Sequence, residues 1–332
     1  MKFFWSVMMA VWSTGLLPAA GLDDYAEPGR FKVEVQRFDW HDGKRDRDVP
    51  ATVYLPQRRT NDGSAPVIIF SHGLGGTRDG YEYLGRHWAS HGFVSVHLQH
   101  LGSDDGVWKG SARPMEAMRA ATTNPQNITH RPRDVSFAID ELTRLEKADA
   151  SWRGRVDLSR LGVAGHSFGA YTTLAVAGQG GTLLSARDER VKAAIPISAP
   201  ATKGARPSIY DAITIPLLHL TGTKDDSPIG HTSPSDRRIP FDRIQNAPEF
   251  LITFEGADHL VFGGRRTQSG DVPTLQMVKA STTAFWEMTL RDDAKARAWL
   301  NETNGFKAAL GTLGTFEQKT PRRLTGLRPA GK

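Results

Sequence analysis

The sequence of 332 residues contains no cysteine. No disulfide can form, so the stability of the fold does not depend on the redox state of its surroundings. A lipid anchor that is attached through a cysteine is excluded for the same reason. The chain also lacks internal repeats and low-complexity tracts, and its length suits one large α/β domain or two small ones.

Long apolar runs are scarce, and the most prominent one lies at the beginning of the chain. Residues 3–17 are mostly apolar with serine and threonine interruptions; Lys2 precedes them, and the small residues 18–21 follow. The run is shorter than a membrane span. A positive residue, an apolar stretch and small residues together are typical of a signal peptide. We therefore expect residues 1–21 to direct export to the periplasm or the medium, with no stable membrane insertion after cleavage.

The basic residues do not form a continuous surface pattern. The net charge is +6, but the arginine pairs are scattered along the chain with no interleaved aromatic residues. We expect no nucleic-acid partner. His97 and His100 are three residues apart on an expected strand and would point to opposite faces, so we expect no metal site there. The glycine-rich residues 73–76 lack a P-loop lysine and a G-x-G-x-x-G spacing, and we expect no cofactor.

The pattern with the strongest chemical meaning is Gly165-His166-Ser167-Phe168-Gly169. This G-x-S-x-G motif follows an apolar run typical of a strand and precedes a stretch typical of a helix. A strand, a sharp turn and a helix form the nucleophile elbow of serine hydrolases. The turn is so tight that a side chain at Gly165 or Gly169 would crowd the serine. We expect Ser167 to be the nucleophile and the Phe168 N–H to be an oxyanion donor.

A serine nucleophile needs a histidine base and a carboxylate that orients it. In α/β-hydrolases these partners follow the serine in the order acid, then histidine. Asp225 follows the expected strand 216–221, and Asp226 is its rival; we favour Asp225. His259 follows the expected strand 249–255, and we expect it to be the general base.

The second half of an oxyanion hole is expected after an earlier strand. Residues 67–70 form a continuous apolar run, as buried parallel strands do. The glycine-rich loop that follows is of the kind that supplies an oxyanion donor in esterases. We assign the Leu74 N–H as this donor, next to the Phe168 N–H.

Three segments resemble the platelet-activating-factor acetylhydrolase branch of the α/β-hydrolases: residues 70–76, 89–93 and 165–169. Bacterial members of this group are often described as predicted dienelactone hydrolases or as cutinase-like polyester hydrolases. The resemblance covers about residues 50–300 and is weak in residues 101–131. It implies a triad of Ser167, Asp225 and His259, with oxyanion donors at Leu74 and Phe168, in agreement with the motifs.

Some departures limit what the resemblance implies. A true dienelactone hydrolase uses a cysteine nucleophile, which this chain lacks. Polyester hydrolases of the group usually have methionine where Phe168 stands. Dehalogenases and epoxide hydrolases would have aspartate in place of Ser167.

We therefore expect a serine carboxylic-ester hydrolase that acts on short-chain acyl esters of small molecules or lipids through an acyl-enzyme. The alternatives are a polyester hydrolase or a serine peptidase of the same fold and, further away, a non-catalytic binding protein on this scaffold.

The expected fold is an α/β-hydrolase with a mainly parallel eight-stranded sheet and helices on both faces. Residues 22–300 are expected to form this domain. Residues 101–131 are an insertion whose Trp108, Met115 and Met118 either line an acyl pocket or pack the loop down. Residues 301–332 are expected to be a partly disordered C-terminal extension.

Overall fold

The computed structural model describes residues 20–58, 62–181, 185–201, 203–227, 229–264 and 271–321. The expected signal peptide lies outside the described residues except for its last two positions. The last eleven residues of the C-terminal extension also lie outside them, so the disorder expected at the end of the chain concerns residues that are not described.

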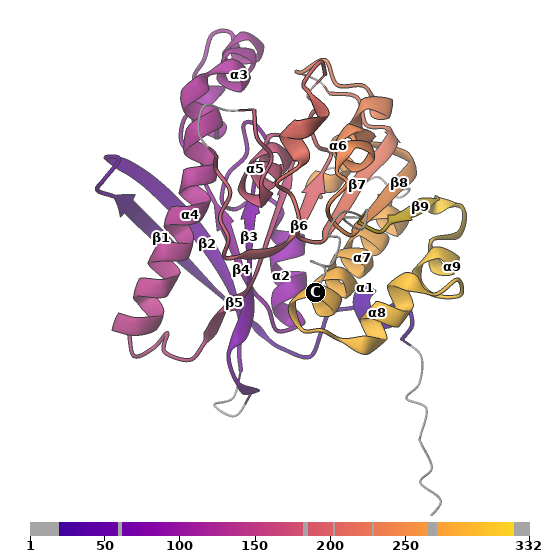
Figure 1. The fold of residues 1–332 in the computed structure, drawn as a ribbon. Coiled ribbons are helices and arrows are strands. Elements are labelled where there is room, and N and C mark those ends of the chain that lie inside the picture. The colour runs from indigo at the N-terminus through magenta and orange to yellow at the C-terminus, as the bar shows by residue number, and fades with distance from the viewer. Residues whose placement is uncertain are drawn as a thin grey trace, which may run out of the picture.

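A single twisted sheet runs through the described part of the chain, in the strand order β1-β2-β4-β3-β5-β6-β7-β8-β9 (Figure 1). Strands β3 to β8 pair in parallel, whereas β1 and β2 at one edge and β9 at the other are antiparallel to their neighbours. The strands are β1 (Val33–Asp42), β2 (Arg47–Pro56), β3 (Ala65–Ser71), β4 (Val94–Leu98), β5 (Val156–His166), β6 (Val191–Ile197), β7 (Leu217–Lys224), β8 (Glu249–Asp258) and β9 (Gly314–Lys319).

The expected number of eight strands is wrong, because the sheet has nine. The additional strand β9 comes from the C-terminal extension and pairs with β8. In β9 only Phe316 is buried, and its ring stacks on Phe250 at 5.9 Å. A strand with one buried side chain lacks the alternating pattern by which strands are predicted from sequence.

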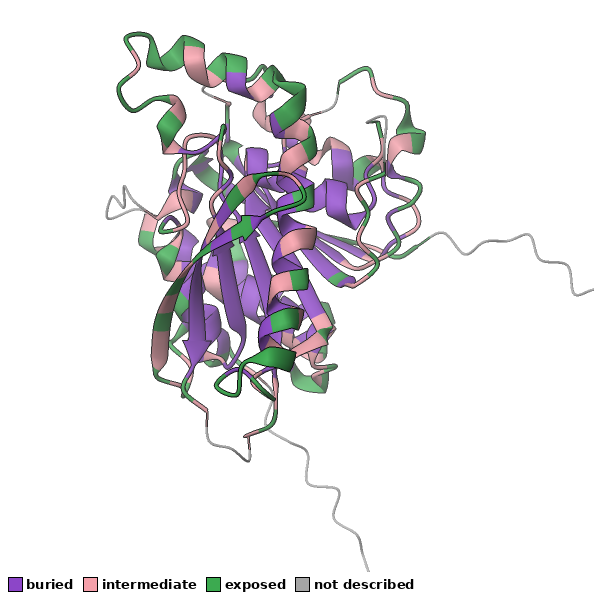
Figure 2. Cartoon of the chain, turned by 90° about the vertical axis from the view of Figure 1, so that its left-hand side faces the viewer, coloured by how far each residue is buried: buried purple, intermediate pink, exposed green. Residues whose placement is uncertain are grey.

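Helices cover both faces of the sheet (Figure 1). Helices α4 and α5 contribute to the apolar core on one face, and α1, α2, α7 and α8 to the core on the other. Figure 2 shows that the central strands between them are buried, whereas α3 is largely exposed. The helices are α1 (Asp23–Ala26), α2 (Glu82–Ser90), α3 (Pro114–Thr123), α4 (Pro125–Ala148), α5 (Phe168–Ala177), α6 (Ile239–Arg243), α7 (Val272–Leu290), α8 (Ala294–Asn301) and α9 (Phe306–Leu310), and the short 3-10 helices include η2 (Asp105–Val107), η3 (Pro207–Tyr210), η4 (Pro234–Arg238), η5 (Val261–Gly263) and η7 (Gly311–Leu313).

The parallel strands place the chemically interesting loops at one edge of the sheet. In a parallel sheet the carboxyl ends of all strands lie on the same side, and ligand sites form there. The loops after β3, β5, β7 and β8 carry the residues that the motifs single out. Within the described ranges, none of the helices has both the length and the apolar character that crossing a membrane requires.

Candidate active site

Ser167 occupies a strained turn between β5 and α5. Its backbone has φ 57° and ψ −116°, a conformation that residues other than glycine rarely adopt. The flanking glycines make this turn possible: a Cβ at Gly165 would lie 2.4 Å from the carbonyl oxygen of Gly169, and a Cβ at Gly169 would lie 1.9 Å from that of Ser71. Backbone strain held by close packing is a common feature of functional sites.

The structure brings Ser167, His259 and Asp225 into one chain of hydrogen-bonding contacts. The Ser167 Oγ lies 2.9 Å from Nε2 of His259, and Nδ1 of His259 lies 2.7 Å from Oδ1 of Asp225. Asp225 is fully buried, and the Thr221 hydroxyl donates to its second oxygen at 2.8 Å. Asp226 is exposed, and the carboxylate that His259 contacts at hydrogen-bond distance is that of Asp225. Of the two aspartates, the structure therefore places Asp225 against the histidine.

Leu74 and Phe168 line the same pocket as Ser167. Phe168 is the first residue of α5, where a backbone N–H has no partner within the helix. Among the described residues, neither the Leu74 N–H nor the Phe168 N–H donates a hydrogen bond within the chain. Both donors are thus available to an acceptor that enters the pocket.

A buried network supports the loop that carries Leu74. The His72 ring accepts a hydrogen bond from the His100 N–H, and Arg131 donates to the carbonyl of His72. Arg131 also donates to the Ser103 hydroxyl at 2.8 Å, and its guanidinium lies over the Phe168 ring. Burial and the charge of Arg131 hold the pKa of His72 well below its ordinary value, so this ring stays neutral.

A second row of serine, histidine and aspartate lies in the interior below this loop. Nε2 of His100 is 3.1 Å from the Ser71 Oγ, and its Nδ1 is 2.9 Å from Asp134. Burial lowers the pKa of His100 to about 4. Asp134 also accepts hydrogen bonds from Arg45 and Arg47. Because all three members of the row are buried, it anchors the end of β3 and has no access to a substrate.

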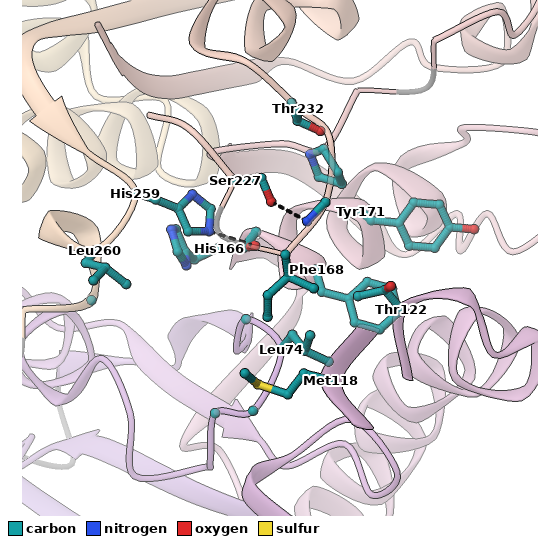
Figure 3. Close-up of a pocket in the computed structure, with 18 of the residues that line it drawn as sticks. Leu74, Met118, Thr122, His166, Phe168, Tyr171, Ser227, Thr232, His259 and Leu260 are labelled. Carbon is teal, nitrogen blue, oxygen red and sulfur yellow. Dashed lines mark hydrogen bonds between the residues drawn. The ribbon is translucent and has the colours of Figure 1, made fainter. Parts of the chain in front are cut away.

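The pocket above Ser167 has a volume of about 610 Å³. Figure 3 shows His259 and His166 together at one side of it, and Leu74 with Met118 at another. Apart from Ser167 and His259, its walls are mainly apolar groups and backbone, and they include the side chains of Leu74, Met118, Ile128, Phe168, Tyr171 and Leu260. An apolar pocket with a few convergent polar groups is the usual form of a small-molecule site.

The insertion of residues 101–131 contributes to this pocket in two ways. Met118 and Thr122 of α3 line the wall next to the glycine-rich loop. Trp108 donates from its indole N–H to the Gly75 carbonyl at 2.9 Å and so fixes that loop. Met115, by contrast, is exposed. Both expected roles of the insertion therefore apply: Met118 lines the pocket, and Trp108 holds a loop in place.

Two residues near the site were not assigned to it from the sequence. Arg237 is buried next to both Asp225 and His259, although in the sequence it is one of several scattered arginine pairs. Thr221 is an ordinary strand residue whose hydroxyl contacts Asp225. No sequence pattern marks either residue, because their roles arise only when η4 and β7 come together in the fold.

Comparison with known proteins places this geometry in a family. The PET hydrolase-like family model matches residues 25–279. Cutinase est1 of Thermobifida alba is 31% identical over 192 residues, which cover 57% of this chain and 52% of the relative. Cutinase est2 of the same organism is 30% identical over 211 residues, with 63% and 56% covered.

A bis(hydroxyethyl) terephthalate hydrolase of Streptomyces coelicolor is 29% identical over 148 residues, which cover 44% of this chain and 36% of the relative. The matched region thus spans roughly half of the length of the two cutinases and 36% of the terephthalate hydrolase. Since the family model covers most of the chain, including every residue of the site described above, the chain belongs to the PET hydrolase-like family.

Proposed function

We propose that this protein is a serine carboxylic-ester hydrolase with a cutinase-like substrate range. The observation that carries the proposal is the chain of contacts from Asp225 through His259 to Ser167, which lies in an apolar pocket. Three residues from the ends of three different strands form the arrangement by which a serine hydroxyl becomes a nucleophile. A binding protein on this scaffold would be indicated by the absence of one of these three residues, and all three are present.

The reaction follows from these positions. A hydrogen on Nδ1 of His259 is directed to Asp225, which leaves Nε2 free to accept the Ser167 proton as the oxygen attacks the ester carbonyl. The N–H groups of Leu74 and Phe168 stabilise the negative oxygen that forms. His259 then gives its proton to the leaving alcohol. Water, activated by the same base, hydrolyses the acyl-enzyme. Each oxyanion donor contributes about 3 kcal/mol by mutational precedent.

The relatives support the polyester alternative more than the short-chain acetylhydrolase interpretation. Two of the relatives named above are cutinases, and the third is named for hydrolysis of a terephthalate diester. The apolar side chains of Phe168, Tyr171 and Met118 suit the acyl part of such an ester, because apolar and aromatic surfaces pack against one another. We therefore expect activity on aromatic diesters and polyesters as well as on simple acyl esters.

The test compares wild type with Ser167→Ala on three kinds of substrate: p-nitrophenyl esters from acetate to palmitate, bis(hydroxyethyl) terephthalate, and a polyester film. Wild type should hydrolyse the terephthalate diester and release soluble products from the film. Ser167→Ala should lose all of these activities, whereas Ser151→Ala, at an exposed serine, should keep them. Turnover of short p-nitrophenyl esters alone would favour the acetylhydrolase-like interpretation. The absence of hydrolysis with every ester would overturn the proposal.

We also infer that the protein is exported by means of residues 1–21. The support is the order of a lysine, an apolar stretch and small residues at the start of the sequence. Mass spectrometry of the protein recovered from outside the cytoplasm should give a mature N-terminus near Gly21 or Leu22. An intact Met1 in that fraction would contradict cleavage.

A further inference from the structure

Arg237 is the charged side chain whose position the proposed reaction leaves unexplained. It lies on η4 and is only 3% exposed. A buried guanidinium is costly unless its N–H groups find acceptors. Nη1 donates to the carbonyl oxygens of Ser198 at 2.8 Å and Ala199 at 3.2 Å, and Nε donates to the carbonyl oxygen of Asp225 at 3.1 Å. Arg237 therefore ties together the loops that follow β6 and β7.

The same guanidinium also touches the contact between the proposed acid and the proposed base. Nε lies 3.3 Å from Oδ1 of Asp225, the oxygen that faces His259. Nη2 lies 3.2 Å from Nδ1 of His259. One positive charge is thus within contact distance of both members of the pair. A structural link between two loops needs only the carbonyl contacts, so this placement calls for a second explanation.

We propose that Arg237 is a positioning residue that holds the Asp225–His259 pair in register and places a positive charge against the base. This inference rests on the proposed function of the triad. A cation in contact with an imidazole disfavours its protonated form, and low exposure leaves this interaction poorly screened. Asp225 acts in the opposite direction, because its carboxylate stabilises the imidazolium. Arg237 shares the Oδ1 oxygen and reduces that effect.

The other groups around His259 do not replace this cation. The His166 ring lies 4.6 Å from the His259 ring, and burial holds its pKa well below the ordinary value, so it stays neutral. Burial lowers the pKa of Arg237 from its ordinary value, whereas the nearby carboxylates, which include Asp226 and Asp236, favour its charged form. Asp258 precedes His259, but its carboxylate accepts from the Leu260 and Val261 N–H groups. Among the described residues that line the pocket with His259, the one lysine or arginine is Arg237.

The experiment measures how the pH dependence changes when the charge is removed. The variants are Arg237→Gln and Arg237→Met, which are neutral, and Arg237→Lys, which keeps the charge. Arg238→Gln is the matched control, because the neighbouring Arg238 is half-exposed and pairs with Asp242 and Glu317 away from the site. Two readouts are compared: the acid limb of kcat/KM with p-nitrophenyl butyrate, and the NMR titration of the His259 ring, assigned with His259→Asn.

Both neutral variants should move the midpoint of the acid limb and of the ring titration upward by about one pH unit. Arg237→Lys should stay close to wild type, and so should Arg238→Gln. If the neutral variants lose activity with no change in either midpoint, Arg237 is only a structural link and the inference fails. The ring titration requires no turnover, so it tests Arg237 even if the protein proves inactive on esters. Arg237→Met leaves no unpaired polar group and serves if Arg237→Gln does not fold.

Discussion

The carbonyl oxygen of Ser71 fills the space that a side chain at Gly169 would need. An ideal Cβ on Gly169 would lie 1.9 Å from this oxygen, far inside van der Waals contact. The end of β3 and the start of α5 thus meet backbone to backbone. This contact sets the distance between the loop with Leu74 and the turn with Ser167, which are the two halves of the proposed oxyanion hole.

Gly169→Ala should therefore damage both stability and activity. The added methyl group forces β3 and α5 apart, and overpacking of this kind costs about 2 kcal/mol. We expect a lower midpoint in urea unfolding and a large loss of kcat on p-nitrophenyl butyrate. Gly43→Ala is the control, because nothing lies within 4 Å of a Cβ at that position. A Gly169→Ala variant with wild-type kcat would show that the contact does not position the oxyanion donors.

Asp225→Asn and Asp226→Asn should differ sharply in activity. Asparagine at position 225 can present an N–H to His259 and favour the wrong tautomer, for which the serine-protease precedent is a loss of about 10⁴-fold in kcat. Asp226 is exposed, so Asp226→Asn should change kcat less than about threefold. Steady-state kinetics of the two purified variants checks this. The opposite ranking would mean that Asp226 orients the histidine in solution.

Much of this site could be predicted from the sequence, because apolar runs and glycine motifs give the order of strands and turns. Residues 67–70 and 161–164 are continuous apolar runs, and the structure contains them in β3 and β5. Polar residues directly after such runs lie at the carboxyl edge of a parallel sheet. Ser167, Asp225 and His259 could therefore be placed together without a structure.

The features that could not be predicted depend on contacts between distant segments. Strand β9 has one buried side chain, and Lys319 at its end pairs with the buried Glu249 of β8 at 2.8 Å. Nothing near Lys319 in the sequence indicates that partner. Arg237 is similar, since its acceptors come from the ends of β6 and β7. Pairwise charge contacts across a fold leave no local periodicity.

Asp134→Asn should destabilise the fold through the network below the glycine-rich loop. Asp134 is fully buried and accepts hydrogen bonds from His100, Arg45 and Arg47. Removal of one partner from a buried ion pair leaves charge uncompensated and costs about 3–5 kcal/mol. Urea unfolding gives the loss. Asp140→Asn on the same helix α4 is the control, because Asp140 pairs with Arg190 at the surface and should cost less than about 1 kcal/mol. Equal losses would contradict a special role for the buried pair.

Glu287 should make the stability of the fold depend on pH between about 4.5 and 7. Burial raises the pKa of this carboxyl from its ordinary value of 4.5 to about 7, although Arg291 beside it acts in the opposite direction. The native state thus holds the proton more tightly than the unfolded chain does. The stability that this gives is fully present below pH 4.5 and is lost as the pH rises through 7. A shift of this size corresponds to a loss on the order of 3 kcal/mol.

Because Glu287→Gln removes the titrating group, its free energy of unfolding should fall less than that of wild type as the pH rises. Between pH 5 and pH 8 the difference should change by about 2 kcal/mol in favour of the variant. The variant also loses the ion pair between Glu287 and Arg291. This loss lowers the stability of the variant mainly at high pH, so it reduces the expected difference and cannot produce it. Glu82→Gln is the control, since Glu82 forms a similar pair with Arg86 at the surface. Parallel stability curves for wild type and Glu287→Gln would show that the carboxyl does not retain its proton in the fold.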